Sequence, residues 1–100
     1  MEKRNLIEMK ILEEVAPTLR TLSHPLRLRI LDVLKDGERS VTEIAVALNK
    51  TQPLTSHQLS IMRGRGVLTT RRMGPNVYYS VKNRAALGLL DCIRKAKTGR

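Results

Sequence analysis

Polar side chains recur at helical spacing between Thr51 and Arg65. Positions three and four apart share one face of a helix, and this face carries Gln52, Ser56, Ser60 and Arg63. Amide, hydroxyl and guanidinium groups form hydrogen bonds with base edges, and the DNA major groove admits a helix. This pattern predicts a surface that reads double-stranded DNA. An ordinary solvated helix face is the alternative, so the neighbouring residues decide between the two.

Those neighbours are basic, and no Asp or Glu lies between Thr51 and Leu90. We expect contacts with base edges from Gln52, Ser56, His57 and Ser60. Phosphates or the minor groove are the expected targets of Thr51, Arg63, Arg65, Arg71, Arg72 and Asn76. Thr55 completes the predicted DNA-binding set, although it shares the core-facing side of the helix with Leu59 and Met62.

Net charge supports a polyanionic partner. The 100-residue chain carries a formal charge of +10, and the charge is unevenly placed. Residues 1–50 hold nine basic and eight acidic side chains, whereas residues 51–100 hold ten basic and one acidic. A basic half favours nucleic acid or an anionic membrane, because a merely soluble surface normally mixes both signs.

Helical periodicity and turn residues define the elements that position these side chains. Apolar spacing predicts a first helix over residues 5–22, ended or kinked at Pro17. The residues Ser23-His24-Pro25 predict the start of a second helix that ends at Asp36-Gly37, with Ser23 as the capping hydroxyl. Ser40-Val41 is at most a fragment of strand. Thr42 is expected to cap a short helix over residues 43–48, and Thr51 to cap the next.

A hairpin and a last helix complete the chain. Strands are predicted over residues 67–72 and 77–81, joined by Met73-Gly74-Pro75-Asn76. Asn83 can cap a helix over residues 84–97. The expected fold is mainly α (α+β), a winged helix-turn-helix in the order α-α-(β)-α-α-β-β-α. It forms one domain over residues 1–100, with a helix-turn-helix over residues 42–64 and a wing over residues 67–81. Wide apolar stripes make residues 1–22 and 84–97 the expected dimerisation helices.

Three segments in this order resemble the ArsR/SmtB-type repressors of bacteria and archaea. They are LRTLSHPLRLRILDVL, SVTEIAVALNKTQPLTSHQLSIMRGRGVL and TTRRMGPNVYYSV, which together cover residues 19–81. The resemblance implies a homodimer built from the first and last helices, in which two recognition helices bind an operator and the wings lie on flanking DNA. It also implies release from DNA when an inducer binds, but no residue in the chain identifies that inducer.

Metal sensing is common in this family, yet the family's ligand positions do not hold suitable residues here. Aligning through Thr51-Gln52-Pro53 places Ser40 and Thr42 where the best-known site has two cysteines, and neither is a good ligand for a soft metal. A second family site uses Asp and His on the last helix, where this chain has Asp91 but no His. We therefore expect a regulator without a metal or cofactor.

The chain has a single thiol, Cys92, and two imidazoles, His24 and His57. Cys92 excludes an intrachain disulfide, and a small core residue is its expected role. The functional hypothesis is a redox-active thiol near the dimer axis. His24 lies in a capping turn and is expected to be structural, whereas His57 is either a DNA contact or a partly exposed residue without a special role.

Other functional classes receive less support. The sequence contains no Gly-rich phosphate loop, and its His and Cys residues are not spaced as in a catalytic site, so an enzyme is not indicated. The basic last helix lacks the aromatic anchors of a membrane-surface helix, and no apolar run indicates a signal peptide or a membrane span. The main alternative is a winged-helix module that docks an acidic protein. The sequence therefore predicts a cytoplasmic, dimeric, sequence-specific DNA-binding transcriptional regulator, expected to be a repressor.

Overall fold

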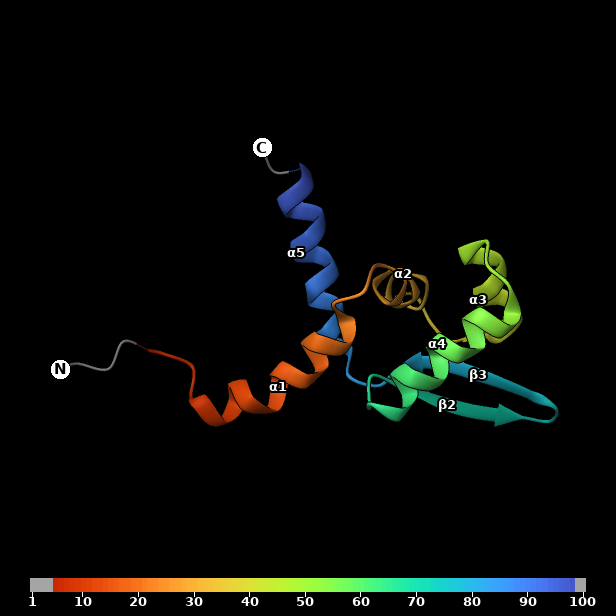
Figure 1. Cartoon of the computed structure of the whole chain (residues 1–100), viewed down its shortest axis with the longest axis horizontal. Helices are drawn as coiled ribbons and strands as arrows, with labels where there is room; N and C mark the ends of the chain where they lie inside the picture. Colours follow the sequence, from red (N-terminus) through yellow and green to blue (C-terminus); the bar gives the residue numbers. More distant parts are fainter. Residues whose placement is uncertain (1–4, 99–100) are drawn as a thin grey trace.

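The computed structural model describes residues 5–98. Along the chain lie α1 (Met9–Leu22), α2 (Pro25–Val33), β1 (Arg39–Ser40), α3 (Val41–Leu48), α4 (Gln52–Gly64), β2 (Leu68–Met73), β3 (Asn76–Val81), the 3-10 turn η1 (Arg84–Ala86) and α5 (Leu87–Thr98). This order confirms the predicted winged helix-turn-helix of the mainly α class (Figure 1).

The core is built from branched aliphatic side chains of α2, the helix-turn-helix and the hairpin. Ile30, Leu31 and Leu34 from the α2 segment are fully buried, as are Ile44 of α3 and Leu59 of α4. Each such side chain contributes about 1.5–3 kcal/mol through removal of its apolar surface from water. This burial holds α3 and α4 against α2, and so determines which face of α4 remains exposed.

The wing is a tight antiparallel hairpin. The strand order is β1-β3-β2, and Met73 lies opposite Asn76 in the register of β2 and β3. The turn therefore consists of Gly74 and Pro75. Gly74 has a φ of 62°, and the proline ring holds φ of the second position near about −65°, which is the sign pattern of a type II′ turn. Such a turn matches the twist of the strands and gives a narrow wing tip.

α1 and α5 project from the body, which gives the chain extents of 58 × 33 × 20 Å (Figure 1). Only the last turn of α1 is buried, through Thr21 and Leu22. The rest of the N-terminal segment exposes large apolar side chains, with exposed fractions from 42% at Leu12 to 80% at Leu6. The set comprises Leu6, Ile7, Met9, Ile11, Leu12, Val15 and Leu19. An apolar stripe of this length is unpartnered in a single protomer.

The first helix differs from its sequence prediction at its start and at Pro17. It begins at Met9 rather than residue 5, because the backbone of Glu8, with φ of −60° and ψ of 140°, is not helical. α1 continues through Pro17, so the expectation that the helix ends there is wrong, whereas the predicted end at Leu22 is confirmed. A kink at Pro17 stays a prediction. Pro17 and Glu13 are both exposed. Water can therefore reach the Glu13 carbonyl that Pro17, without an N–H, leaves unpaired.

Two helix caps also fall on residues other than those predicted. His24, not Ser23, caps α2, and its Nδ1 accepts a hydrogen bond from the Leu26 N–H at 3.2 Å. This contact gives His24 the structural role that was expected. Ser40, not Thr42, caps α3, because Glu43 stands three residues after Ser40 and completes a capping box. Asn83 acts as a cap as predicted, through a hydrogen bond from the Ala85 N–H, but it caps η1, and the α-helix expected over residues 84–97 begins only at Leu87.

Candidate nucleic-acid interface

The exposed face of α4 carries most of the predicted base-reading residues. Thr55, Gln58, Leu59 and Met62 are its buried residues and face the core. The remaining positions leave Gln52, Ser56, His57, Ser60 and Arg63 exposed to solvent. A continuous polar surface therefore runs along α4 from its first residue toward its C-terminus.

Thr55 does not belong to that surface. Its side chain is 0% exposed, and its Oγ1 donates a hydrogen bond of 2.8 Å to the Thr51 carbonyl. The prediction that Thr55 contacts DNA is therefore wrong. Its position on the same side as Leu59 outweighs its polar character, because the hydroxyl is satisfied by the backbone one turn earlier.

Two hydrogen bonds that involve polar side chains hold the N-terminus of α4. The Thr51 hydroxyl accepts from the Leu54 N–H at 3.3 Å and caps the helix. Gln52 reaches across to α3, where its Nε2 donates to the Thr42 hydroxyl at 2.6 Å. Gln52 is therefore not a freely rotating side chain, although it is exposed.

An interior hydrogen bond fixes α4 to the helices beneath it. The Oε1 of the buried Gln58 accepts from Arg27 Nε at 2.9 Å, and Arg27 also donates through Nη1 to the Thr21 carbonyl at 3.2 Å. Sequence reasoning assigned no role to this pair. The feature of the sequence that could have indicated the burial of Gln58 was its place beside Leu59, on the apolar side of α4. This network sets the orientation of α4 relative to α2 and α1.

The two adjacent arginines of the wing have different surroundings. Arg71 donates three hydrogen bonds to the Glu38 carboxylate, the shortest of 2.8 Å from Nη2, and its Cζ lies 5.6 Å from the Tyr78 ring centre. The hydrogen bonds from Arg71 hold the pKa of Glu38 below its usual value, and those to Glu38 raise the pKa of Arg71. Arg72 is exposed and has no such partner among residues 5–98. Arg72 is therefore the wing cation that is available to a phosphate.

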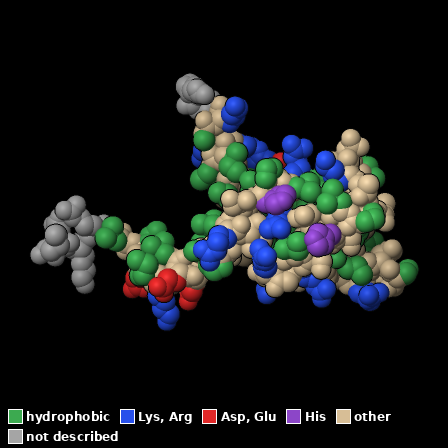
Figure 2. Space-filling view, viewed as in Figure 1, with side chains coloured by type: hydrophobic (Ala, Val, Ile, Leu, Met, Phe, Trp, Pro, Cys, Tyr) green, Lys and Arg blue, Asp and Glu red, His purple; other side chains and the backbone are tan. Residues whose placement is uncertain are grey.

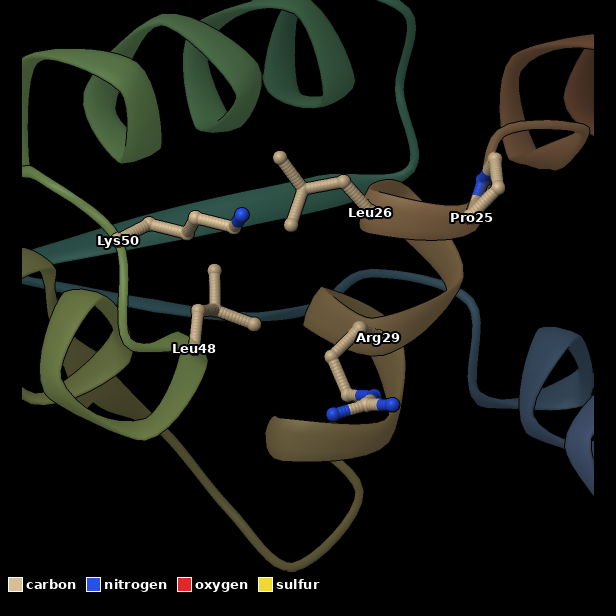
Figure 3. A pocket seen from close by; sticks show the side chains of 5 residues that line it. All are labelled: Pro25, Leu26, Arg29, Leu48 and Lys50. Atoms are coloured by element: carbon tan, nitrogen blue, oxygen red, sulfur yellow. The ribbon is translucent and has the colours of Figure 1, made fainter.

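Further cations border two surface hollows beside the recognition helix. Arg65, at the end of α4, lines one hollow together with Arg20 of α1. The other hollow is lined by Arg29 of α2, by Lys50, which precedes the Thr51 cap, and by the apolar Leu26 and Leu48 (Figure 3). Arg20, Arg29 and Lys50 were not in the predicted contact set. The position of Lys50 next to the helix cap was the signal that could have identified it.

The distribution of charge over the surface follows the sequence asymmetry. In Figure 2 most of the visible acidic side chains lie over α1, whereas blue basic and purple histidine side chains lie over the body. On the wing, Asn76 is exposed at the tip beside Gly74 and Pro75. The positive potential therefore surrounds α4 and the wing, where a phosphate backbone would pass.

The remaining candidate residues lie apart from this surface. Cys92 is exposed on α5, so the expectation of a buried core residue is wrong, and a redox role stays a prediction. Among residues 5–98, no three His, Cys, Asp or Glu side chains come together as a metal site would require. No helix in the described part of the chain combines the length and apolar character needed to cross a membrane.

Comparison with known proteins places this geometry in a family. The model of the bacterial regulatory protein family named arsR matches residues 24–70, which include the helix-turn-helix. The biofilm growth-associated repressor of Agrobacterium fabrum is 38% identical over 80 residues, which are 80% of this chain and 68% of that protein. The chain belongs to the arsR family. It is a DNA-binding transcriptional regulator, as the sequence predicted.

Solved structures of arsR-type proteins share the whole architecture. The crystal structure of the transcriptional repressor BigR from Xylella fastidiosa superposes with a TM-score of 0.79 at 36% identity, covering 87% of this chain and 89% of that one. A homodimeric winged helix-turn-helix DNA-binding domain from Mycobacterium bovis gives a TM-score of 0.78 at 26% identity, covering 98% of this chain and 96% of that one. The arsR-type fold therefore includes the projecting α1 and α5 of this chain.

Proposed function

We propose that this protein is a cytoplasmic repressor that binds a double-stranded DNA operator as a homodimer. The observation that carries the proposal is the exposed polar face of α4, flanked by cations such as Arg63, Arg65 and Arg72 that have no acidic partner among residues 5–98. In this arrangement Gln52, Ser56, His57 and Ser60 face base edges. Phosphates or the minor groove are the partners of Thr51, Arg63, Arg65, Arg72 and Asn76. Lys50, which was not predicted from the sequence, joins this set of contacts.

Dimerisation through the N-terminal helix follows from its unpartnered apolar stripe. Leu12, Val15 and Leu19 are each more than two-fifths exposed in the protomer, and Ile93 of α5 adds a further exposed apolar side chain. Burial of such a stripe against a second copy removes it from water and stabilises both helices. Two-fold symmetry then places two α4 helices on one side of the DNA duplex. Half-sites are expected to be about 10 bp apart, or a multiple of that spacing.

The same proposal assigns no metal to the regulatory step. Ser40 occupies a position where family relatives hold a metal-binding cysteine, and its hydroxyl instead accepts a hydrogen bond from the Glu43 N–H at 3.2 Å. Thr42 accepts from Gln52. Both side chains therefore have structural roles that compete with ligation.

In vitro selection of random duplexes by the purified protein tests this function. The winning sequence is then titrated at two salt concentrations. A two-fold-symmetric consensus with steep salt dependence is the expected result, because phosphate contacts release counterions. Replacement Gln52→Ala should cost about 1–3 kcal/mol and relax the preference at one base pair. Binding without a consensus would contradict sequence-specific repression, and no binding at all would favour an acidic protein partner.

A further inference from the structure

The hydrogen bond from Gln52 to Thr42 restricts the amide that leads the recognition helix. The two residues come from different helices, since Gln52 opens α4 and Thr42 is the second residue of α3. The N-terminus of α3 is itself fixed, because Ser40 and Glu43 form a reciprocal capping box with hydrogen bonds of 2.9 and 3.2 Å. A β-branched threonine has few side-chain rotamers. Thr42 is therefore a stiff anchor for a side chain that would otherwise rotate about three bonds.

This anchor determines which hydrogen-bonding groups Gln52 still offers. A glutamine amide has two N–H donors and one carbonyl acceptor. Thr42 occupies one donor at 2.6 Å, so one N–H and the Oε1 carbonyl remain for a base. The side chain thus presents one donor and one acceptor to the major groove.

Among single bases, only adenine uses both remaining groups. Its N7 accepts from an N–H while its N6 amino group donates to a carbonyl. Guanine presents two acceptors, O6 and N7, and would need the donor that Thr42 occupies. Cytosine offers only a donor and thymine O4 only an acceptor, so either base would leave one amide group without a partner.

The surroundings of Gln52 suit the other half of the same base pair. Val41, Pro53 and Ser56 line a hollow together with Gln52. Val41 and Pro53 present apolar surface beside the amide, and the C5 methyl of thymine is the apolar group that the major groove displays. An A·T pair therefore matches both the amide and the hollow.

We propose that Thr42 is a positioning residue that orients Gln52 to recognise an A·T base pair in each operator half-site. The inference rests on the proposed operator binding, and it adds the identity of one base pair and the residue that sets it. Thr42 acts through Gln52 and is not itself a base contact.

The test uses selection from random duplexes with the wild-type chain and three variants. Gln52→Ala identifies the position that Gln52 reads. Thr42→Val keeps the shape of the side chain but removes the hydroxyl, and Thr42→Ser is the matched control that keeps it. Dissociation constants are then measured by fluorescence anisotropy on the consensus duplex and on one with G·C at the identified position.

A clear set of outcomes supports the proposal. The wild-type chain should prefer A·T over G·C at the position read by Gln52 by about 5- to 150-fold. Thr42→Ser should retain this ratio, and Thr42→Val should lower it by about threefold or more, because a freed amide can turn to serve other bases. The salt dependence of binding should be the same for both Thr42 variants, because no phosphate contact changes.

Other outcomes overturn it in distinguishable ways. Gln52→Ala identifies one position by the loss of its base preference. If the wild-type chain prefers a base pair other than A·T at that position, the adenine assignment is contradicted. An unchanged A·T preference in Thr42→Val contradicts the positioning role. If the wild-type chain selects no consensus, the proposed operator binding itself fails, and the inference fails with it.

Discussion

The ion pair between Arg71 and Glu38 predicts that Arg71 of the wing is neutralised and makes no contact with a DNA phosphate. In the wild-type chain, the Arg71 guanidinium is bound to a carboxylate from the loop before β1. Replacement Glu38→Gln keeps the shape of that side chain and removes its charge, so Arg71 becomes available to a phosphate. Two protomers gain two such contacts, which together steepen the slope of log K against log salt by about 1.8. When the salt concentration rises about fourfold, the Glu38→Gln variant should therefore lose about twelvefold more affinity than the wild-type chain.

Anisotropy titrations of a labelled duplex over a series of salt concentrations measure this slope. The double variant Glu38→Gln with Arg71→Gln removes the pair without changing net charge, and its slope should equal that of the wild-type chain. Arg72→Ala should make the slope shallower by about 1.8 for two protomers, because no carboxylate in the described part of the chain competes for Arg72. A Glu38→Gln slope equal to that of the wild-type chain would refute the reasoning, and so would a shallower slope in the double variant.

Three further variants test the dimer, the correction at Thr55 and the attachment of α5. Leu12→Glu should lower the oligomeric state in sedimentation experiments, whereas the control Val46→Glu, which changes an apolar residue 75% exposed on α3, should not. Thr55→Val should leave operator affinity unchanged and lower the free energy of unfolding by about 1 kcal/mol or less; a loss of specific binding at unchanged stability would return Thr55 to the contact set. Burial alone would raise the pKa of Asp32, but hydrogen bonds from Arg94 of α5 and from Lys35 hold this pKa below its usual value. Asp32→Asn should therefore destabilise the chain at neutral pH by about 1 kcal/mol or less. Because the native pKa is lowered, this difference should disappear as pH falls through it, in chemical denaturation at several pH values.

Local patterns in the sequence predicted most of the scaffold. The three-to-four spacing of Leu59 and Met62 predicts the buried side of α4, and Thr51 with Pro53 marks its start. Gly74-Pro75 predicts the wing turn because glycine tolerates the positive φ that the first turn position needs, and proline fixes φ at the second. The prediction that the helix ends at Pro17 fails, since a proline in an exposed turn can be tolerated. The cap predicted at Ser23 also fails, because the His24 ring nitrogen accepts the Leu26 N–H instead. The prediction also fails at Thr55, where burial overrides polarity.

The sequence by itself determined the order of the elements, the polar face of α4 and the concentration of positive charge in the second half. These properties depend on side-chain periodicity and charge count over short segments. Only the tertiary structure decided which polar groups remain available. Arg71 is occupied by Glu38, Gln52 by Thr42, and Gln58 by Arg27. The partners in these three pairs are 33, 10 and 31 residues apart in the chain. Local spacing cannot indicate such contacts, because they form only after core packing has brought separate elements together.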